Sequence, residues 1–188
     1  DDFRYWLQDG VKVNLCSIHQ IHKFAKWGKR EPVGLRFNPG MGSGGTNRTN
    51  VGGPASSFGI WKGDLEEAKS LCKNYGLEVE RIHTHIGSGS DPEVWKKVAN
   101  MSLDLVKAFP SVKTLNLGGG YKVARMGNEV ATDLNEIGQP VKELFEQFAE
   151  ETGRQLKLEI EPGTFLLAHA CSLVTSIQDI TSTGQDGY

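Results

Sequence analysis

The sequence predicts an α/β fold, an incomplete (β/α)₈ barrel of the TIM type with about five βα units, on three observations. Short alternating apolar runs take turns with longer amphipathic runs, which is typical of βα units around a parallel sheet. Each predicted strand has one apolar and one polar face, whereas strands of a doubly wound sheet tend to be apolar throughout. Five strands in 188 residues are too few for a closed barrel of eight strands and about 250 residues.

The elements follow from this alternation and from helix-capping chemistry. Asp64 with Glu67 resembles a capping box, and Gly76 can end that helix. Asp91 with Pro92 begins the next helix as a cap followed by a first-turn proline. Predicted strands cover residues 11–15, 33–37, 79–86, 114–118 and 156–161, and predicted helices cover 17–28, 64–75, 91–108 and 139–152.

Two further segments have a distinct composition. Residues 39–59 are crowded with Gly, Ser and Asn, which predicts a long mobile loop of the kind that is usually functional or disordered. Residues 165–180 form an apolar run that could begin as a helix and continue as a strand.

Composition narrows the function classes. A net charge of −2 with interspersed signs offers no basic field for nucleic acid or anionic lipid, and no run approaches the roughly 18 apolar residues of a membrane span. Three widely spaced cysteines argue against a disulfide framework and favour a cytoplasmic protein. The first residues do not resemble a secretory signal, and Met is absent from position 1, so we expect the chain to begin inside a longer protein. The sequons at Asn47 and Asn100 are interpreted as chance matches.

The two faces of the strands separate apolar from polar side chains, because side chains alternate along a strand. In a barrel the apolar face meets the outer helices and the polar face converges inside, towards the carboxyl ends of the strands where TIM-barrel sites lie. The expected outward set is Val13, Leu15, Leu35, Phe37, Ile82, Thr84, Ile86, Leu115, Leu117, Leu158 and Ile160. The expected inward set is Asn14, Cys16, Arg36, Asn38, His83, His85, Asn116, Glu159 and Glu161.

Two strand ends carry small or imidazole side chains. Gly118, Gly119 and Gly120 directly follow a strand, and such a run can admit a phosphate or simply form a tight turn. It matches neither the dinucleotide fingerprint nor the P-loop. The pair His83 and His85 could bind a metal, but no third ligand is marked by spacing, so we expect no metal. The alternative is a hydrogen-bonded interior histidine.

Glu159 and Glu161 place two carboxylates on one face of the last strand. They could act as a glycosidase-like acid and base, or as a structural pair holding Arg36, since a buried carboxylate needs a partner. Two carboxylates two positions apart on one strand cannot easily flank a scissile bond, so the glycosidase reading is disfavoured.

Five motifs, in order, resemble those of the fold-type III pyridoxal-phosphate decarboxylases, whose barrel is of the alanine racemase-like type. They are "LRFNPG", "SSFGI", "HTHIGSGSDPEVW", "LNLGGGYKV" and "EIEPGTFLLAHACSLV". Within this family the similarity is greatest to members that decarboxylate meso-diaminopimelate to L-lysine. Relatives that act on ornithine, arginine or a carboxylated polyamine remain alternatives, as does a non-catalytic regulatory relative.

The resemblance implies roles around pyridoxal 5'-phosphate. His85 resembles the histidine that stacks on the pyridine ring. Ser88 and Gly118–Gly120, helped by Gly163, resemble the phosphate cradle. Glu161 resembles the carboxylate that pairs with the pyridinium nitrogen, where a protonated ring accepts electrons left behind by departing carbon dioxide.

The resemblance also implies supporting residues and one departure. Arg36 resembles an interior arginine behind the cofactor, and Phe58 and Gly59 belong to a loop near it. The cofactor-binding residue after Gly163 is usually Arg in the family, but here it is Thr164, which supplies a hydroxyl and no charge. This departure weakens the expectation of diaminopimelate as substrate.

By the same resemblance, the Schiff-base lysine and the catalytic cysteine of a C-terminal β-domain lie outside this chain, so we expect no catalytic residue within it and no activity from it alone. Lys157 and Lys122 are in the wrong context to replace the lysine, and Cys171 is expected to be a core residue of the preceding helix. Residues 1–172 are expected to be part of the cofactor-binding barrel, and 173–188 the start of the connection to the β-domain. The family builds its sites across a homodimer and acts on small amino acids.

Overall fold

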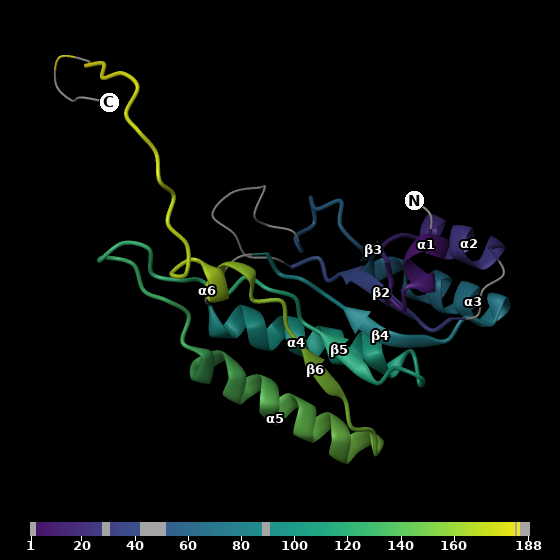
Figure 1. The fold of residues 1–188 in the computed structure, drawn as a ribbon. Coiled ribbons are helices and arrows are strands. Elements are labelled where there is room, and N and C mark those ends of the chain that lie inside the picture. The colour runs from purple at the N-terminus through teal and green to yellow at the C-terminus, as the bar shows by residue number, and fades with distance from the viewer. Residues whose placement is uncertain (1–2, 28–30, 42–51, 88–90, 183, 185–188) are drawn as a thin grey trace.

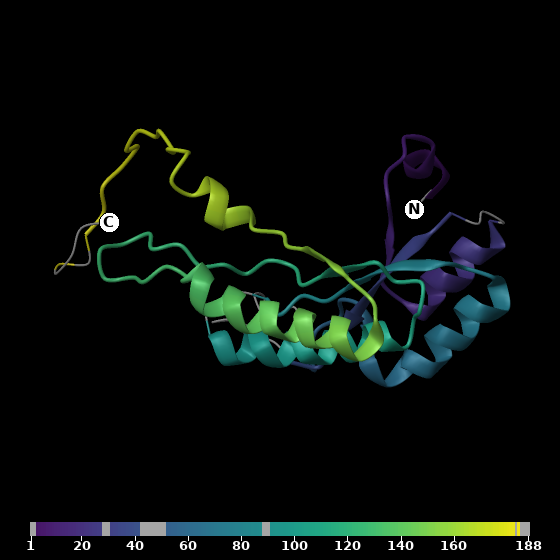
Figure 2. The same cartoon turned by 90° about the horizontal axis from the view of Figure 1, so that it is seen from below.

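The structure is a computed structural model that describes residues 3–27, 31–41, 52–87, 91–182 and 184. Its longer helices lie on one face of a parallel sheet, and the chain after the last helix extends away from the rest (Figures 1 and 2). The strands are β1 (Asn14–Leu15), β2 (Val33–Asn38), β3 (Ile60–Trp61), β4 (Val79–His83), β5 (Thr114–Asn116) and β6 (Lys157–Glu159). The helices are α1 (Phe3–Gln8), α2 (Ile18–Lys26), α3 (Leu65–Tyr75), α4 (Pro92–Lys107), α5 (Leu134–Thr152) and α6 (Gly163–Leu167), with a 3₁₀ turn η1 (Lys62–Asp64).

The strand order confirms the predicted fold class. Neighbours in the sheet run β1-β2-β4-β5-β6, all parallel, and β3 pairs with the end of β2. Strands therefore follow one another in chain order, without the reversal that creates the switch point of a doubly wound sheet. α3, α4 and α5 lie on one side of the sheet (Figure 2), as the outer helices of a barrel do. The described sheet is thus one part of a barrel.

The apolar core lies between the sheet and these helices, as the alternation of the strands predicts. Ile82 of β4 is in register with Leu115 of β5, which in turn is in register with Leu158 of β6. Ile82 and Leu115 are fully buried, and Trp95 of α4 is the largest fully buried side chain. Leu158 is 44% exposed because β6 is an edge strand in the described sheet.

A polar pair lies inside this core. Thr84, just after β4, and Ser102 of α4 are both fully buried, with their hydroxyl oxygens 2.8 Å apart. Ser102 donates to the Val98 carbonyl at 2.6 Å, so its own oxygen is the acceptor for Thr84. The pair ties α4 to the end of the strand that carries the two histidines.

The structure confirms some of the predicted helix ends and contradicts others. Asp91 caps α4 by accepting from the Glu93 N–H, and Gly76 ends α3 in the left-handed conformation. Asp64 lies at the expected N-cap of α3 but makes no side-chain capping bond, because the preceding residues form η1, so the capping box was wrong. α5 begins five residues earlier than predicted, where Asp133 accepts from the N–H groups of Asn135 and Glu136. Capping and a buried apolar face offset the interior proline of this helix.

The C-terminal run differs from the prediction. α6 forms at its start, but residues 171–181 are neither helix nor strand, so the expected continuation as a strand is wrong. Cys171 is exposed and lies beyond the end of α6, so its assignment to the helix core was also wrong, since no described element packs against it. The predicted loop 39–59 is irregular wherever it is described before β3, and residues 42–51 lie outside the described residues.

None of the helices in the described ranges is both long enough and apolar enough to cross a membrane. The predicted boundary between residues 172 and 173 stays a prediction.

Candidate functional site

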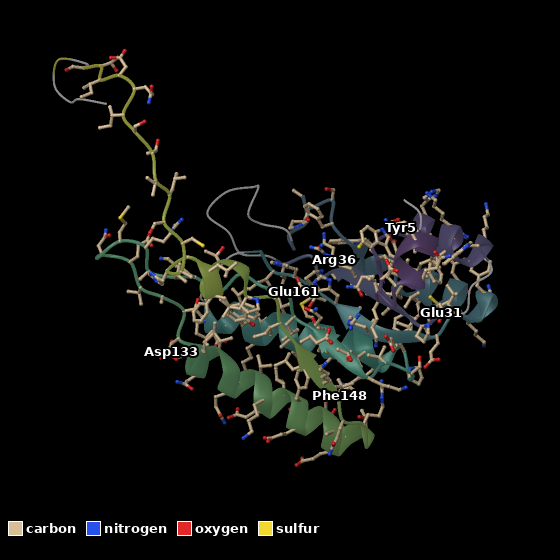
Figure 3. The ribbon with its side chains drawn as sticks, in the orientation of Figure 1. Tyr5, Glu31, Arg36, Asp133, Phe148 and Glu161 are labelled. Atoms are coloured by element: carbon tan, nitrogen blue, oxygen red, sulfur yellow. The ribbon has the colours of Figure 1, made fainter. Side chains whose placement is uncertain are left out.

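The carboxyl ends of β4, β5 and β6 bring polar side chains together on the face of the sheet opposite α3, α4 and α5. His83 ends β4, Asn116 ends β5, and Glu161 follows β6 by two residues. Arg36 of β2 and Glu161 lie on the opposite side of the sheet from Phe148 of α5 (Figure 3). The predicted inward face is thereby confirmed for these strand ends.

Glu161 is held through one of its two carboxylate oxygens. The Asn116 side-chain amide donates to Glu161 Oε1 at 2.9 Å, and the other end of that amide accepts from the Gly118 N–H at 2.8 Å. The Glu161 N–H donates to the Gly118 carbonyl at 2.9 Å. In the described structure Oε2 takes part in no hydrogen bond or ion pair, and the Glu161 side chain is 47% exposed. One oxygen is therefore fixed, and the other has no partner among the described residues.

His85 lies directly against the glycine run. A Cβ on Gly118, whose φ is +73°, would be 2.7 Å from His85 Cγ, and a Cβ on Gly119 would be 2.3 Å from the Glu161 carbonyl oxygen. His85 Nδ1 accepts from the Gly87 N–H at 2.9 Å, which places the ring proton on Nε2. Burial and the charge of Arg36 lower the pKa of His85, although the charge of Glu161 opposes them. His85 is therefore neutral at pH 7.

His83 is a second, more deeply buried histidine that the sequence placed on the inward face but did not assign to the site. Its Nδ1 is 3.5 Å from Asn14 Nδ2, and its Nε2 is 3.7 Å from Glu161 Oε1. Neither His83 Nε2 nor Asn14 Oδ1 has a hydrogen-bond partner in the described structure. The signal was available in the sequence, because His83 is two residues before His85 and so shares its face.

Glu159 lies one layer below Glu161 and is paired with Arg81 of β4. The guanidinium donates to both carboxylate oxygens, at 2.9 and 3.3 Å. Burial acts to raise the pKa of Glu159, but the hydrogen bonds and charges of Arg81 and Lys157 outweigh it, and the pKa is lowered. The predicted partner, Arg36, was wrong: its guanidinium lies 5.2 Å from the centre of the Phe58 ring. Arg81 faces inward two residues before His83, so strand alternation could have found it.

The segment before β3 is tied to the same site. The Asn38 side chain donates to the carbonyls of Gly53 and Ser56, and a Cβ on Gly52 would lie 2.4 Å from the His85 carbonyl oxygen. Gly59, with φ at +88°, packs so closely that a Cβ would be 2.9 Å from the Asn38 nitrogen. These close approaches hold the described end of the loop against β2 and β4.

The remaining predicted site residues are placed less tightly. Gly163 begins α6 and donates its N–H to the Glu161 carbonyl at 2.9 Å, with open space where a Cβ would be. Thr164 is exposed in the same short helix. Gly120 has φ at +107°, and within the described chain the N–H groups of Gly119 and Gly120 donate no hydrogen bond. Ser88 lies outside the described residues.

No group of three His, Cys, Asp or Glu side chains among the described residues is arranged to hold a metal ion.

The sheet topology and the polar strand ends define the chain as part of a (β/α)-barrel protein with a site at the carboxyl ends of its strands. Within that class, the chain belongs to the pyridoxal-dependent decarboxylases, because the family model "Pyridoxal-dependent decarboxylase, pyridoxal binding domain" matches residues 1–168. Pyridoxal phosphate is accordingly the cofactor of the family.

Curated relatives and solved structures agree with this membership. The chain is 33% identical over 175 residues to the diaminopimelate decarboxylase of Escherichia coli (strain K12) and 32% identical over 180 residues to that of Streptomyces coelicolor. The matches cover 93% and 95% of this chain but only 42% and 41% of those relatives.

Among solved structures, a diaminopimelate decarboxylase crystal structure matches with a TM-score of 0.87 at 30% identity, over 100% of this chain and 45% of that one. An arginine decarboxylase from Paramecium bursaria Chlorella virus matches with a TM-score of 0.63 at 20% identity, over 82% of this chain and 40% of that one. This second match supports the fold alone.

Proposed function

We propose that the natural protein containing this chain is a pyridoxal-phosphate-dependent decarboxylase that converts meso-diaminopimelate to L-lysine. The observation that carries the proposal is the strand-end site, in which His85, the glycine run and Glu161 meet in a chain of this family. The substrate is inferred from the two curated relatives, both named diaminopimelate decarboxylase, which are 33% and 32% identical to this chain.

The site fits the cofactor at three points. The absence of a Cβ at Gly118 and Gly119 lets His85 and the Glu161 carbonyl lie directly against the glycine run. The N–H groups of Gly119 and Gly120 donate no hydrogen bond among the described residues, which leaves them for an anion. The outward oxygen of Glu161 has no hydrogen-bond partner in the described structure. We infer that Gly118–Gly120 bind the phosphate, with Ser88, Gly163 and Thr164 as further contacts.

His85 and Glu161 would orient the ring. When bound, pyridoxal phosphate supplies an electron-accepting ring that stabilises the negative charge left on the substrate carbon as carbon dioxide departs. A neutral His85 presents a flat, uncharged face, so it can stack on a protonated pyridine without charge repulsion. Glu161, as an anion, accepts a hydrogen bond from the ring nitrogen and favours the protonated state of that atom. Arg36 and Phe58 pack behind this site, with Gly59 beside β2.

Carbon dioxide release from the intact natural protein tests the proposal. We expect release with meso-diaminopimelate and a cofactor adduct after borohydride reduction. Glu161→Gln should reduce turnover at least about a hundredfold, given the scale of electrostatic effects in catalysis, while Glu150→Gln on the exposed face of α5 should leave it unchanged. Equal turnover in the two variants would contradict the role of Glu161.

Thr164 gives a specific reason to test other substrates. It is uncharged and exposed, where the resemblance led us to expect an arginine. Ornithine, arginine and a carboxylated polyamine should therefore be assayed beside meso-diaminopimelate. Faster turnover of any of these would reassign the substrate, and a cofactor adduct without release from any substrate would indicate a non-catalytic relative.

We further propose a cytoplasmic homodimer, with residues 1–172 contributing to the barrel that binds the cofactor. The three free cysteines support the cytoplasmic location, the polar strand ends support the role in the barrel, and the dimer follows from the family resemblance. Light scattering of the intact protein tests the dimer, and a monomeric mass with full activity would contradict it.

A further inference from the structure

The buried side of Glu161 is arranged around a single oxygen. Asn116 Nδ2 donates to Oε1 at 2.9 Å, and His83 Nε2 lies 3.7 Å from the same atom. The second distance is too long for a hydrogen bond, because a side-chain separation of about 3.6 Å no longer counts as one, so an approach of a few tenths of an ångström would complete it. Because the Glu161 side chain is 47% exposed while that of His83 is 7% exposed, the carboxylate is the partner that can move.

The neighbours of His83 determine which ring nitrogen carries the proton. Asn14 Oδ1 occupies the position where a Cβ of Gly34 would lie, and an oxygen suits that place because the glycine Cα–H groups are weak donors. The amide nitrogen of Asn14 therefore faces His83 Nδ1, at 3.5 Å, and that ring nitrogen is the acceptor. The proton of a neutral His83 is then on Nε2, directed at Glu161.

Burial, assisted by the positive charges around it, keeps His83 neutral. Arg36, Arg81 and His85 disfavour a second proton on the ring, and only Glu161 favours it. Burial is the largest influence, and it lowers the pKa of His83 to about 4. At pH 7 the ring can donate one hydrogen bond, from Nε2, and carries no charge that would neutralise the carboxylate.

We propose that His83 is a positioning residue that donates from Nε2 to Glu161 Oε1, so that the carboxylate stays ionised and its Oε2 is presented to the ring nitrogen of the cofactor. This inference rests on the proposed function, because it gives a partner to the residue that we assign to that nitrogen. It also accounts for a buried imidazole nitrogen that lacks a hydrogen-bond partner in the described structure.

Two substitutions of His83 separate positioning from packing. Gln can place an amide N–H near the position of Nε2, whereas Asn reaches only the position of Nδ1. In the intact protein, we expect His83→Asn to weaken equilibrium binding of pyridoxal phosphate about tenfold, as for one lost hydrogen bond to a charged group. We expect His83→Gln to remain within about threefold of wild type. Equal weakening by both variants would mean that His83 only fills space, and would overturn the proposal.

Nitrogen NMR with ¹⁵N-labelled pyridoxal phosphate provides a readout that packing alone does not change. A donor to Oε1 keeps the carboxylate weakly basic, so the shared proton stays on the ring nitrogen. In His83→Asn the ring signal should move towards its unprotonated position, and in His83→Gln it should return. In a Glu161→Gln background, His83→Asn should have no further effect on cofactor binding.

Cofactor binding by these variants distinguishes a wrong role for Glu161 from a wrong role for His83. If Glu161→Gln binds the cofactor as tightly as wild type, the proposed role of Glu161 fails. If Glu161→Gln weakens binding but His83→Asn does not, only the role of His83 fails. Should His83→Asn not fold, the ring ¹⁵N signals of His83 in the wild-type protein decide: a proton on Nε2 supports the proposal, and a proton on Nδ1 overturns it.

Discussion

Replacing Gly118 with Ala tests the close packing of the site without reference to its function. Gly118 has φ at +73°, and its Cβ would lie 2.7 to 2.9 Å from three atoms of His85. The left-handed backbone costs an L-residue about 1–2 kcal/mol, part of which is offset by the lower entropy of the unfolded chain. Overpacking against the half-buried ring adds about 1–3 kcal/mol. We expect a total loss of about 2–4 kcal/mol in the free energy of unfolding.

Gly76→Ala is a matched control, because Gly76 has φ at +64° and nothing within 4 Å of the added Cβ. It should lose only the backbone part, about 1 kcal/mol. Urea unfolding of the intact protein, free of cofactor, measures both variants, and the difference between them isolates the contact with His85. If Gly118→Ala is no less stable than Gly76→Ala, the histidine does not lie against the glycine run and the site described above is wrong.

Three further predictions concern the Arg81–Glu159 pair, the buried His83 and the buried Thr84–Ser102 pair. Because the hydrogen bonds and charge of Arg81 outweigh burial and lower the pKa of Glu159, Arg81→Ala should cost about 2–3 kcal/mol at pH 7. The cost should shrink as the pH falls through the lowered pKa of the carboxylate, and a cost that stays constant in urea unfolding as the pH is lowered would contradict this pairing. Burial lowers the pKa of His83 from an ordinary 6.5 to about 4, so the unfolded chain binds a proton at this residue before the folded chain does. The free energy of unfolding should therefore drop by roughly 3 kcal/mol between pH 6.5 and pH 4. His83→Gln should reduce this drop, and an unchanged pH profile in that variant would refute the assignment. Ser102→Ala leaves the buried Thr84 hydroxyl without its acceptor and should cost about 1–3 kcal/mol. Thr84→Val should cost less, because it leaves the hydrogen bond from Ser102 to the Val98 carbonyl intact. The opposite order of stability in thermal unfolding would be inconsistent with these donor assignments.

Strand alternation was sufficient to predict the fold class and the inward face of the strands. It placed His83, Asn116 and Glu161 on one side because each belongs to a strand whose opposite face is apolar. It could not pair them, since which side chains meet depends on the register between strands that are distant in sequence. Arg36 was accordingly considered as the partner of Glu159. The register aligns Glu159 with Asn116 and His83, and its carboxylate is bonded to Arg81, which lies two residues before His83 on the same face of β4.

Other elements were missed because their signals are short or are overridden by packing. β3 has only two residues, too few for a period of two to be visible. α5 contains Pro140 near the predicted start, a residue type common in the first turn of a helix, but the Asp133 cap and the buried Ile137 support an earlier turn. Cys171 follows an apolar run that resembles a helix core, yet a helix needs a surface to pack on, and none of the described elements provides one.

The position of Glu161 beside the edge of the sheet has a consequence for how the protein assembles. β6 is paired on one side only within the described sheet, and an edge strand is less protected against local opening than a central one. A further strand that pairs with the free edge of β6 would therefore also stabilise the residues that lead from β6 to Glu161. We expect a strand that pairs with this edge to raise cofactor affinity, because it would suppress local opening of the residues that lead to Glu161.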